Sequence, residues 1–373
     1  MQSNRRPPMG RNQRRENWLL RQLRRRPKPL WMVAVAHAAV LGIALLIYAL
    51  PHHVIPSAGE AVGIVSVRGG APAEAAPVAA VEPETTPEPM AEPVVQAVAE
   101  PTPDPTPEAT AAPVGYFRDK FADHFNADGS VYNSGGVYRS GNVEISVSEQ
   151  FDSELTVRYQ VADIYISDIS GLSTAFARNK YGSGYREWTY EIGQRYGSII
   201  TLSGDYYGAR DNGIVIRNGT LYRNAKNVND VCVLYWDGTM RTFSPYEFNA
   251  ELEMSNGAYQ CWNFGPELLD DNGVAFTSFN STVNKANPRS VIGYYEPGHY
   301  CFVTVDGRSK SSVGMTMQQL AKLMENMGCK AAFNLDGGQS AMMCAGTTVL
   351  NNPYSGGREV SDVIMILDIA SQM

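Results

Sequence analysis

Apolar and polar residues alternate along several short stretches after residue 115, and this period of two predicts half-buried β-strands. The alternation is clearest at 143–147 and 155–159, and the apolar run 161–166 predicts a further strand. Runs bounded by turn residues predict other strands, at 198–202, 213–217, 232–235, 291–295, 300–305, 331–335 and 363–367. Asn218-Gly219 and Asp237-Gly238 lie between such runs, and these residue pairs predict hairpin turns.

Helical periodicity is rarer. It predicts helices at 188–196 and 316–327, each followed by a glycine. Thr316 can cap the start of the second helix, in which four apolar side chains share one face: Leu320, Leu323, Met324 and Met327. Many strands, few helices and no regular strand–helix alternation predict an α+β domain of mixed β-sheets rather than a doubly wound fold.

The first 114 residues lack this alternation. Residues 1–29 are dominated by arginine, and residues 30–50 are apolar apart from His37. The length of the apolar run predicts a single transmembrane helix, and its basic flank predicts a cytoplasmic N-terminus. A cleaved secretory signal is the alternative, but the run is longer than a signal's core and no clear small-x-small cleavage site follows it. Either interpretation places the rest of the chain outside the cytoplasm.

Residues 51–114 are rich in Ala, Pro and Glu, with repeated Glu-Pro and Thr-Pro steps between 71 and 113. Few large apolar residues and many prolines predict a disordered linker, which is either a stalk of adapted length or a plain spacer. The predicted organisation is therefore a basic cytoplasmic tail (1–29), a transmembrane helix (30–50), the linker (51–114) and a folded domain (115–373).

The net charge of −7 understates the acidity of the folded domain, because most of the N-terminal basic residues lie on the other side of the predicted membrane helix. Nucleic acid is therefore not an expected partner. The five cysteines are Cys232, Cys261, Cys301, Cys329 and Cys344, and none has metal-site spacing. Apolar neighbours of Cys232 and Cys301 favour buried, unpaired thiols. An odd number of cysteines leaves at least one thiol free, and the sequence assigns no disulfide pairing.

Groups suited to phosphate and sugar gather in four islands within residues 287–362. They are Asn287-Pro288-Arg289-Ser290, Asp306-Gly307-Arg308, Asn334-Leu335-Asp336-Gly337-Gly338-Gln339-Ser340, and Asn351-Asn352-Pro353 continuing to Gly356-Gly357-Arg358. Three arginines and two carboxylates are costly to bury without partners, so the islands predict loops that meet at a polar cleft. Such a cleft suits an anionic substrate.

Each island also has a purely structural interpretation. The glycines after Asp336 either permit a tight turn or let backbone N–H groups approach a phosphate, with Gln339 and Ser340 adding side-chain bonds. The arginines either hold phosphate oxygens, which match the planar guanidinium fork, or form ion pairs with local acids such as Asp306 and Glu359.

The order of the islands resembles the phosphodiester glycosidase family over roughly residues 190–368. The likeness begins at Gly204-Asp205-Tyr206-Tyr207-Gly208, includes Val303 to Arg308 and Asn334 to Ser340, and closes with Gly357-Arg358-Glu359. One position differs from the family, since Ser203 stands where the family usually has asparagine. A serine hydroxyl does not offer the separate donor and acceptor atoms of an asparagine amide.

The resemblance implies cleavage of the bond between a sugar's anomeric carbon and a phosphodiester. A phosphate leaves more readily than an alkoxide, so one carboxylate with an arginine clamp suffices for this chemistry. Asp336 is the first catalytic candidate, Asp306 the second and Asp205 the third. The candidates for substrate binding are Gly204, Tyr206, Asn287, Arg289, Arg308, Asn334, Gly337, Gly338, Gln339, Ser340 and Arg358. Tyr206 and Tyr207 either face a sugar or lie in the core.

The expected function is that of a membrane-anchored, extracytoplasmic hydrolase acting on a sugar-1-phosphodiester in a glycan or envelope polymer, as implied for exopolysaccharide-type relatives. The alternatives are a module that only binds anionic wall polysaccharide and a phosphodiesterase that cleaves the P–O bond. No cofactor is predicted, although a divalent cation on Asp205, Asp306 or Asp336 stays open. His124 and His299 lie outside the islands, which disfavours a zinc site or a Ser-His-Asp triad.

Overall fold

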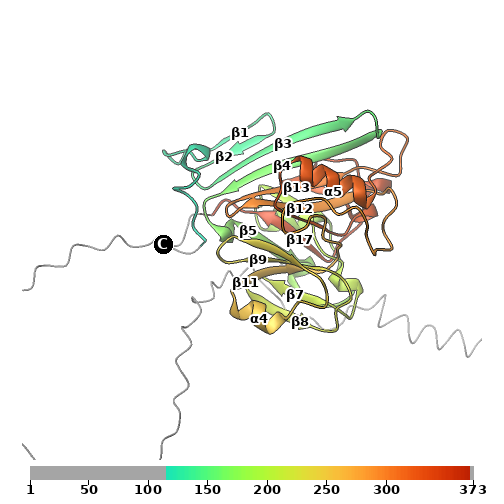
Figure 1. Ribbon diagram of the computed structural model, residues 1–373. Coiled ribbons are helices and arrows are strands. Elements are labelled where there is room, and N and C mark those ends of the chain that lie inside the picture. The colour runs from blue at the N-terminus through green and yellow to red at the C-terminus, as the bar shows by residue number, and fades with distance from the viewer. Residues whose placement is uncertain (1–114, 370–373) are drawn as a thin grey trace, which may run out of the picture. The chain divides into compact units, whose positions relative to one another are not determined.

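The computed structural model describes residues 115–369 of the chain (Figure 1). The predicted tail 1–29, membrane helix 30–50 and linker 51–114 lie outside the described residues, as do residues 370–373. No helix within 115–369 is both long and apolar enough to cross a membrane.

The described part of the chain contains three β-sheets, and every strand pair in them is antiparallel. The largest sheet has seven strands in the order β1-β2-β3-β4-β13-β12-β14. Their bounds are β1 Tyr132–Ser134, β2 Val137–Arg139, β3 Val143–Asp152, β4 Val157–Ile166, β13 His299–Val305, β12 Arg289–Glu296 and β14 Ala331–Asn334.

The other two sheets have five strands each. The first has the order β10-β9-β11-β7-β8, with bounds β10 Met240–Phe243, β9 Val231–Tyr235, β11 Ala258–Trp262, β7 Ile214–Arg217 and β8 Thr220–Asn224. The second has the order β16-β15-β6-β17-β5, with bounds β16 Thr348–Val349, β15 Met343–Ala345, β6 Ile200–Ser203, β17 Asp362–Ile366 and β5 Leu172–Phe176.

The described residues form three α-helices, α3 (Thr189–Arg195), α4 (Ala250–Ser255) and α5 (Met317–Asn326). Helices α3 and α5 confirm the predictions at 188–196 and 316–327, whereas α4 was not predicted. Thr316 caps α5, because its hydroxyl accepts the backbone N–H of Gln319 while the Gln319 side chain accepts the N–H of Thr316. Several sheets with few helices confirm the α+β class.

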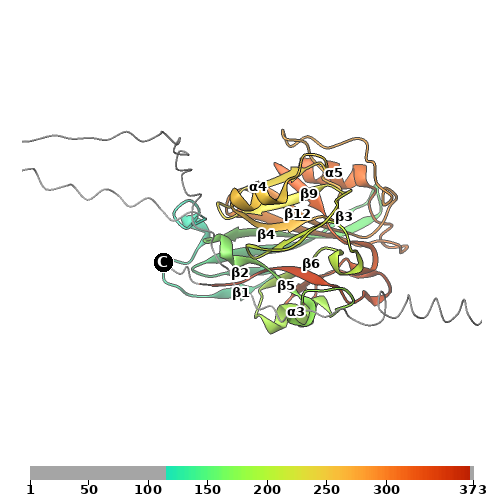
Figure 2. The ribbon, with the colours of Figure 1, turned by 90° about the horizontal axis from the view of Figure 1, so that it is seen from below.

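The largest core cluster takes apolar side chains from all three sheets. It includes Ile145 and Phe302 of the seven-stranded sheet, Leu234 of β9, and Leu202 and Ile364 of the third sheet. Helix α5 covers β12 and β13 through a second cluster (Figure 1). Helix α3 packs against β6, β15 and β17, and Figure 2 shows it beside β5 and β6. Burial of these faces holds the sheets together.

Both predicted hairpins are confirmed, since Asn218-Gly219 joins β7 to β8 and Asp237-Gly238 lies between β9 and β10. Asn218 and Gly219 have φ angles of 50° and 80°, as a type I′ turn requires. The predicted strands 155–159 and 161–166 fall on one strand, β4, which begins only at Val157 because residues 155 and 156 belong to the turn before it. Buried side chains alternate regularly along β4 from Gln160 onward, but Val157, the previous buried residue, lies three positions earlier instead of two. The sequence pattern therefore shows a break although the strand is continuous.

Strands β5 and β11 escaped prediction because each places polar side chains in the core. Thr174 of β5 and Gln260 of β11 are both buried, and the Thr174 hydroxyl donates to Gln260 Oε1 over 2.9 Å. A buried polar side chain is tolerated only when it finds such a partner, and that partner lies on a distant segment. All five cysteines are buried and free of disulfides, and this confirms the prediction of buried, unpaired thiols at Cys232 and Cys301.

Candidate active site

Strand pairing brings three of the four islands to one end of the seven-stranded sheet. Arg289 opens β12 and is paired with Val305, the last residue of β13. Asn334 closes β14 and is paired with Val291, two residues into β12. In antiparallel neighbours the start of one strand lies beside the end of the next. The loops that follow Val305 and Asn334 therefore emerge next to Arg289.

A cavity of about 270 Å³ lies where these loops meet, and we call it the arginine pocket. Its lining residues are Phe264, Val283, Asn287, Arg289, Arg308, Asp336, Gly337, Gly338, Gln339 and Arg358. Eight of these ten were candidates from the sequence. The candidates outside the lining are Gly204, Asp205, Tyr206, Asp306, Asn334 and Ser340.

Asp336 is the carboxylate in this lining. Its Oδ2 accepts hydrogen bonds from the Ser340 hydroxyl over 2.6 Å and from Arg358 Nη2 over 2.8 Å, and Arg358 Nε also donates to the Ser340 oxygen over 2.5 Å. Its backbone N–H donates to Gly204 O over 3.1 Å. Burial raises the pKa of the Asp336 carboxyl, and the charge of Arg358 opposes that rise. Ser340 therefore supports the carboxylate from outside the lining.

Arg289 is 3% exposed and pairs with backbone carbonyls rather than with an acid. Its Nε donates to Met315 O over 2.9 Å, and its Nη2 donates to Val283 O and Lys285 O over 2.7 and 2.6 Å. Burial, together with the positive charge of Arg308, lowers its pKa to about 10. No carboxylate within residues 115–369 forms an ion pair with Arg289, so its charge is balanced only by dipoles.

Arg308 has a left-handed backbone, with φ at 58°, and its side chain is exposed. Its Nε donates to Asn287 Oδ1 over 3.0 Å, and its guanidinium lies over the Tyr354 ring at 5.0 Å from the centroid. The ion pair with Asp306, one structural alternative for this arginine, does not form, and no other acid in the described part of the chain pairs with it. Arg358 pairs with Asp336 and not with Glu359.

The two glycines after Asp336 are required by close contacts in the loop. A Cβ atom at Gly337 would lie 2.6 Å from the carbonyl oxygen of Pro288, and Gly338 has φ at 61°. The backbone N–H of Gly338 donates to the same Pro288 oxygen over 2.9 Å, so this N–H is used within the protein. Gln339 Nε2 donates to Gly357 O over 3.0 Å and ties the third island to the fourth.

Asp306 lies beside the pocket and anchors the fourth island. Its Oδ1 accepts the backbone N–H of Asn352 over 2.9 Å and the Asn351 side-chain amide over 3.1 Å. Burial raises the pKa of Asp306. Asn334 is fully buried, and its Nδ2 donates to Gly265 O over 2.7 Å. These contacts give Asp306 and Asn334 supporting positions.

Asp205 belongs to a buried charge network that the sequence did not reveal. Its Oδ2 accepts the N–H of Asn263 over 2.7 Å and lies 3.8 Å from Arg217 Nη2. Arg217 in turn donates to Asp362 Oδ2 over 2.6 and 2.8 Å, and Asp362 Oδ1 accepts the N–H of Asp205. Burial raises the pKa of Asp362 to about 6 against the opposing charge of Arg217. Arg217 and Asp362 lie in ordinary strands, so no local motif marks them.

Aromatic rings form the wall next to Arg358. Tyr206 is partly exposed and makes an edge contact with Phe264 at 6.4 Å, and the Arg358 guanidinium lies 5.3 Å from the Tyr206 centroid. Tyr207 is 2% exposed and packs against Phe176 in the core. Phe264 lines the pocket and was missed, although it follows strand β11 in a loop. Tyr206 therefore has the position of a binding residue and Tyr207 that of a core residue.

No group of three or more His, Cys, Asp or Glu side chains within residues 115–369 is arranged to hold a metal ion. Neither His124 nor His299 lines the arginine pocket, and their rings stack on the two sides of Tyr165. They pair with Glu144 and Asp163 respectively. A cation on the three candidate aspartates would have to rely on Asp336 in the pocket, because Asp205 and Asp306 are engaged elsewhere.

Residues 196–367 match the family model described as phosphodiester glycosidase, and this range contains every candidate site residue. The SPbeta prophage-derived uncharacterized protein YomE of Bacillus subtilis (strain 168) is 31% identical over 197 residues. That match covers 50% of this chain and 30% of the relative, so the chain spans less than a third of that protein's length.

Among solved structures, the catalytic domain of zebrafish N-acetylglucosamine-1-phosphodiester alpha-N-acetylglucosaminidase is similar at 20% identity and a TM-score of 0.49, over 64% of this chain and 85% of that one. A hypothetical protein from Synechocystis is similar at 12% identity and a TM-score of 0.43, over 63% and 64%. The match of residues 196–367 confirms the resemblance to the phosphodiester glycosidase family that the four islands carried.

Proposed function

We propose that this protein hydrolyses the glycosidic bond of a sugar-1-phosphodiester in the arginine pocket. One observation carries the proposal: Arg289 and Arg308 line the same cavity as Asp336, and neither arginine has an acidic partner within the described residues. A buried arginine without a carboxylate is costly unless an anion completes its environment. A phosphodiester fits because its two free oxygens match the guanidinium fork of Arg308, which uses only Nε within the described residues, and Nη1 of Arg289 adds a further donor.

Each group of residues at the arginine pocket has its own role in the proposed reaction. Arg289 and Arg308 hold the phosphodiester oxygens and stabilise the negative charge that grows on them as the bond breaks. Phe264 and Tyr206 contact the sugar. The Asp336 carboxylate activates water or attacks the anomeric carbon itself, and the C–O bond to phosphate breaks. Water supplies hydroxyl to the sugar, and the phosphate monoester departs as an anion, which needs no strong general acid.

The expected substrate is a glycan or envelope polymer, and the expected site of action is outside the cytoplasm. The arginine-rich residues 1–29 followed by the apolar residues 30–50 support a membrane anchor with this orientation. Residues 51–114 would then act as the tether. Protease treatment of intact cells tests this topology: the folded domain should be cleaved or released from outside, and full protection would reject it.

The proposed activity is tested with the purified full-length chain and an alkyl diester of a sugar 1-phosphate. Release of free reducing sugar supports the glycosidase, whereas release of sugar 1-phosphate supports cleavage of the P–O bond. Tight binding without either product supports a binding module. Parallel reactions with a chelator and with added Mg²⁺ decide whether a divalent cation takes part, and the Asp336→Asn variant serves as the inactive control.

A further inference from the structure

Two further cavities adjoin the arginine pocket. A cavity of about 450 Å³ shares Phe264 and Val283 with the arginine pocket. A third cavity, of about 770 Å³, shares Ser244, Glu267 and Phe276 with the second. We call the second and third cavities together the side groove. The shared lining residues place the side groove next to the site of the proposed reaction.

The size of the arginine pocket limits what it can hold. Sites for small organic ligands usually measure about 300–1,000 Å³, and the arginine pocket lies just below that range. It therefore has room for the phosphodiester and the sugar next to it. The side groove offers room for a larger substrate, because its nearer cavity alone exceeds the arginine pocket in volume.

The near part of the side groove has the aromatic lining that suits sugar rings. Phe264, Phe276 and Phe279 line it together with Tyr246, whose side chain is 96% exposed. An aromatic face packs against the C–H face of a pyranose ring, and the tyrosine hydroxyl remains free to bond a sugar hydroxyl. Tyr246 thus has the accessibility that a stacking platform needs.

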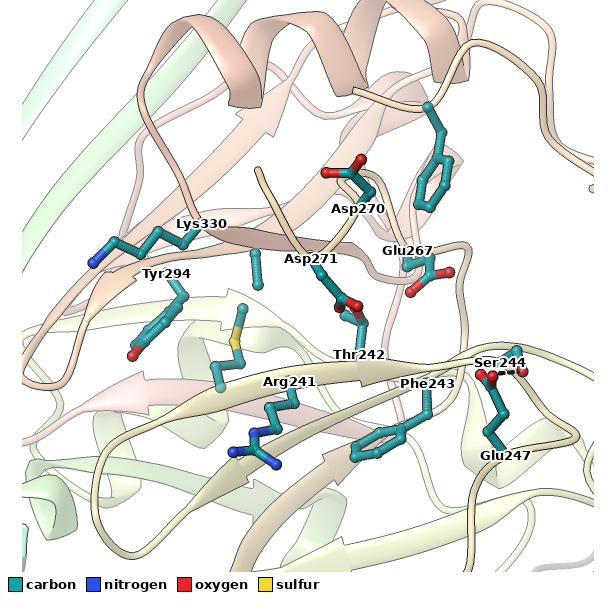
Figure 3. Close-up of a pocket in the computed structure, with 13 residues that line it drawn as sticks. Arg241, Thr242, Phe243, Ser244, Glu247, Glu267, Asp270, Asp271, Tyr294 and Lys330 are labelled. Carbon is teal, nitrogen blue, oxygen red and sulfur yellow. Dashed lines mark hydrogen bonds between the residues drawn. The ribbon is translucent and has the colours of Figure 1, made fainter. Parts of the chain in front are cut away.

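The charges of the two regions are opposite. The arginine pocket has three arginines and one carboxylate. The side groove has five carboxylates, namely Asp230, Glu247, Glu267, Asp270 and Asp271, against three basic side chains, Arg210, Arg241 and Lys330. In the view of Figure 3, Tyr294 and Lys330 lie at one end of the third cavity and Ser244 and Glu247 at the other, with Glu267, Asp270 and Asp271 between them.

The carboxylates of the side groove act on one another. Glu267 and Asp230 are partly buried, and the N–H of Glu267 donates to Asp230 Oδ2 over 3.2 Å. Burial raises the pKa of both, and the negative charges of Asp230, Asp271 and Glu247 raise that of Glu267 further. No ion pair within the described residues neutralises Glu267, Asp230 or Asp271. A second phosphate placed here would be repelled.

We infer that the substrate is an oligosaccharide phosphodiester whose sugars beyond the diester lie in the side groove and are uncharged or carry amines. This inference rests on the proposed function. A polymer that carries a phosphate in every repeat is therefore not the expected substrate, because only the arginine pocket accommodates an anion.

The test compares three substrates that share the same scissile diester: one with a single sugar, one with an uncharged trisaccharide, and one with a phosphate in each repeat. We expect the wild-type kcat/KM to be about tenfold higher for the trisaccharide than for the single sugar, since one stacking contact contributes on the order of that factor. The repeating phosphate should bring no gain. Tyr246→Ala should remove the gain and leave the single-sugar rate unchanged.

A charge reversal tests the electrostatic part. Asp271 is exposed, so Asp271→Lys should fold normally and raise kcat/KM for the repeating-phosphate substrate. Glu154→Lys, an exposed position outside the groove, is the matched control and should change nothing. Equal wild-type rates for the single sugar and the trisaccharide, or a preference for the repeating phosphate, would overturn the inference while leaving the proposed function intact.

If wild type cleaves none of the three substrates, the proposed function fails. A binding measurement then tests whether the side groove accepts uncharged sugars. Calorimetry with the uncharged trisaccharide should show binding to wild type and its loss in Tyr246→Ala. Absence of binding to wild type would overturn the inference independently.

Discussion

Arg358 Nη2 donates to Oδ2 of Asp336 over 2.8 Å, and the Ser340 hydroxyl donates to the same oxygen over 2.6 Å. No hydrogen bond within the described residues reaches Oδ1 of Asp336. One carboxylate oxygen is therefore fixed by two donors, and the other is left for chemistry in the pocket. Such fixed orientation is what a catalytic carboxylate requires, because misplacement lowers its effectiveness.

Replacing Asp336 with asparagine should abolish most turnover and leave the fold intact. The amide can still accept the hydrogen bond from Ser340, but it neither activates water nor attacks carbon. We expect kcat to fall by about 10²- to 10⁴-fold, the usual contribution of a positioned acid–base group. Steady-state kinetics and thermal unfolding measure the two properties, and an active Asp336→Asn enzyme would remove this residue from the catalytic role.

The acidic limb of the pH profile should lie above the ordinary aspartate pKa of about 3.9. Burial raises the pKa of Asp336, and activity requires its ionised form, so kcat/KM falls as the pH drops through that raised pKa. Arg358 opposes the rise. Arg358→Ala should therefore move the limb to higher pH, and Arg358→Lys should keep it close to the wild-type position. A limb that stays in place in Arg358→Ala would contradict the assignment to Asp336.

Removal of the Arg308 side chain should weaken substrate binding without affecting stability. Its side chain is exposed, donates one hydrogen bond to Asn287 and lies over the Tyr354 ring. We expect Arg308→Ala to raise KM about tenfold, as loss of one charge-assisted contact does, with an unchanged melting temperature. Lys310→Ala, an exposed cation in the same loop, is the control. Equal effects of the two variants would show general attraction rather than a specific contact.

Arg289→Ala should behave differently from Arg308→Ala. Arg289 is buried and its guanidinium donates to the carbonyls of Val283, Lys285 and Met315. Its removal leaves Val283 O without a partner and takes one of two donors from Lys285 O and from Met315 O, which keep their bonds from Asn287. Both substrate affinity and stability should therefore fall. Melting curves of the two arginine variants distinguish them, and a stable Arg289→Ala protein would contradict the expected role of these bonds.

A methyl group at Gly337 should displace the loop that carries Asp336. The added Cβ would lie 2.6 Å from Pro288 O, a backbone atom that cannot easily move. We expect Gly337→Ala to lower the free energy of unfolding by about 1–3 kcal/mol, as overpacking does, and to reduce kcat/KM. At Gly141 the nearest atom is the flexible end of the Arg118 side chain, at 3.1 Å, so Gly141→Ala should be milder. Thermal unfolding of both variants checks the difference.

Asp306 should act by positioning the fourth island rather than by touching the substrate. Asp306→Asn retains an oxygen for the N–H of Asn352 and should keep most activity. Asp306→Ala loses it and should destabilise the protein by about 1–2 kcal/mol and raise KM. Kinetics of the two variants beside Asp336→Asn test the distinction, because a catalytic Asp306 would make Asp306→Asn as inactive as Asp336→Asn.

The sequence by itself determined the features that depend on neighbours along the chain. The periodicity of 316–327 and the cap at Thr316 specified α5, and Asn218-Gly219 specified a hairpin, because local backbone preferences decide these elements. The residues and order of the islands predicted the resemblance to the phosphodiester glycosidase family, which the match of residues 196–367 confirms. The density of arginine, glycine and carboxylate marked eight of the ten residues that line the pocket.

The sequence ranked Asp336 first of three candidate aspartates, but only the tertiary structure decided that it lies in the pocket while the other two do not. Asp205, Asp306 and Asp336 stand in similar loop motifs, yet Asp205 is held by a network that includes Arg217 and Asp306 holds Asn352. It also decided that Thr174 and Gln260 lie in buried strands. Each outcome depends on a partner far away along the chain, and the energy of a buried polar group is set by that partner rather than by its sequence neighbours.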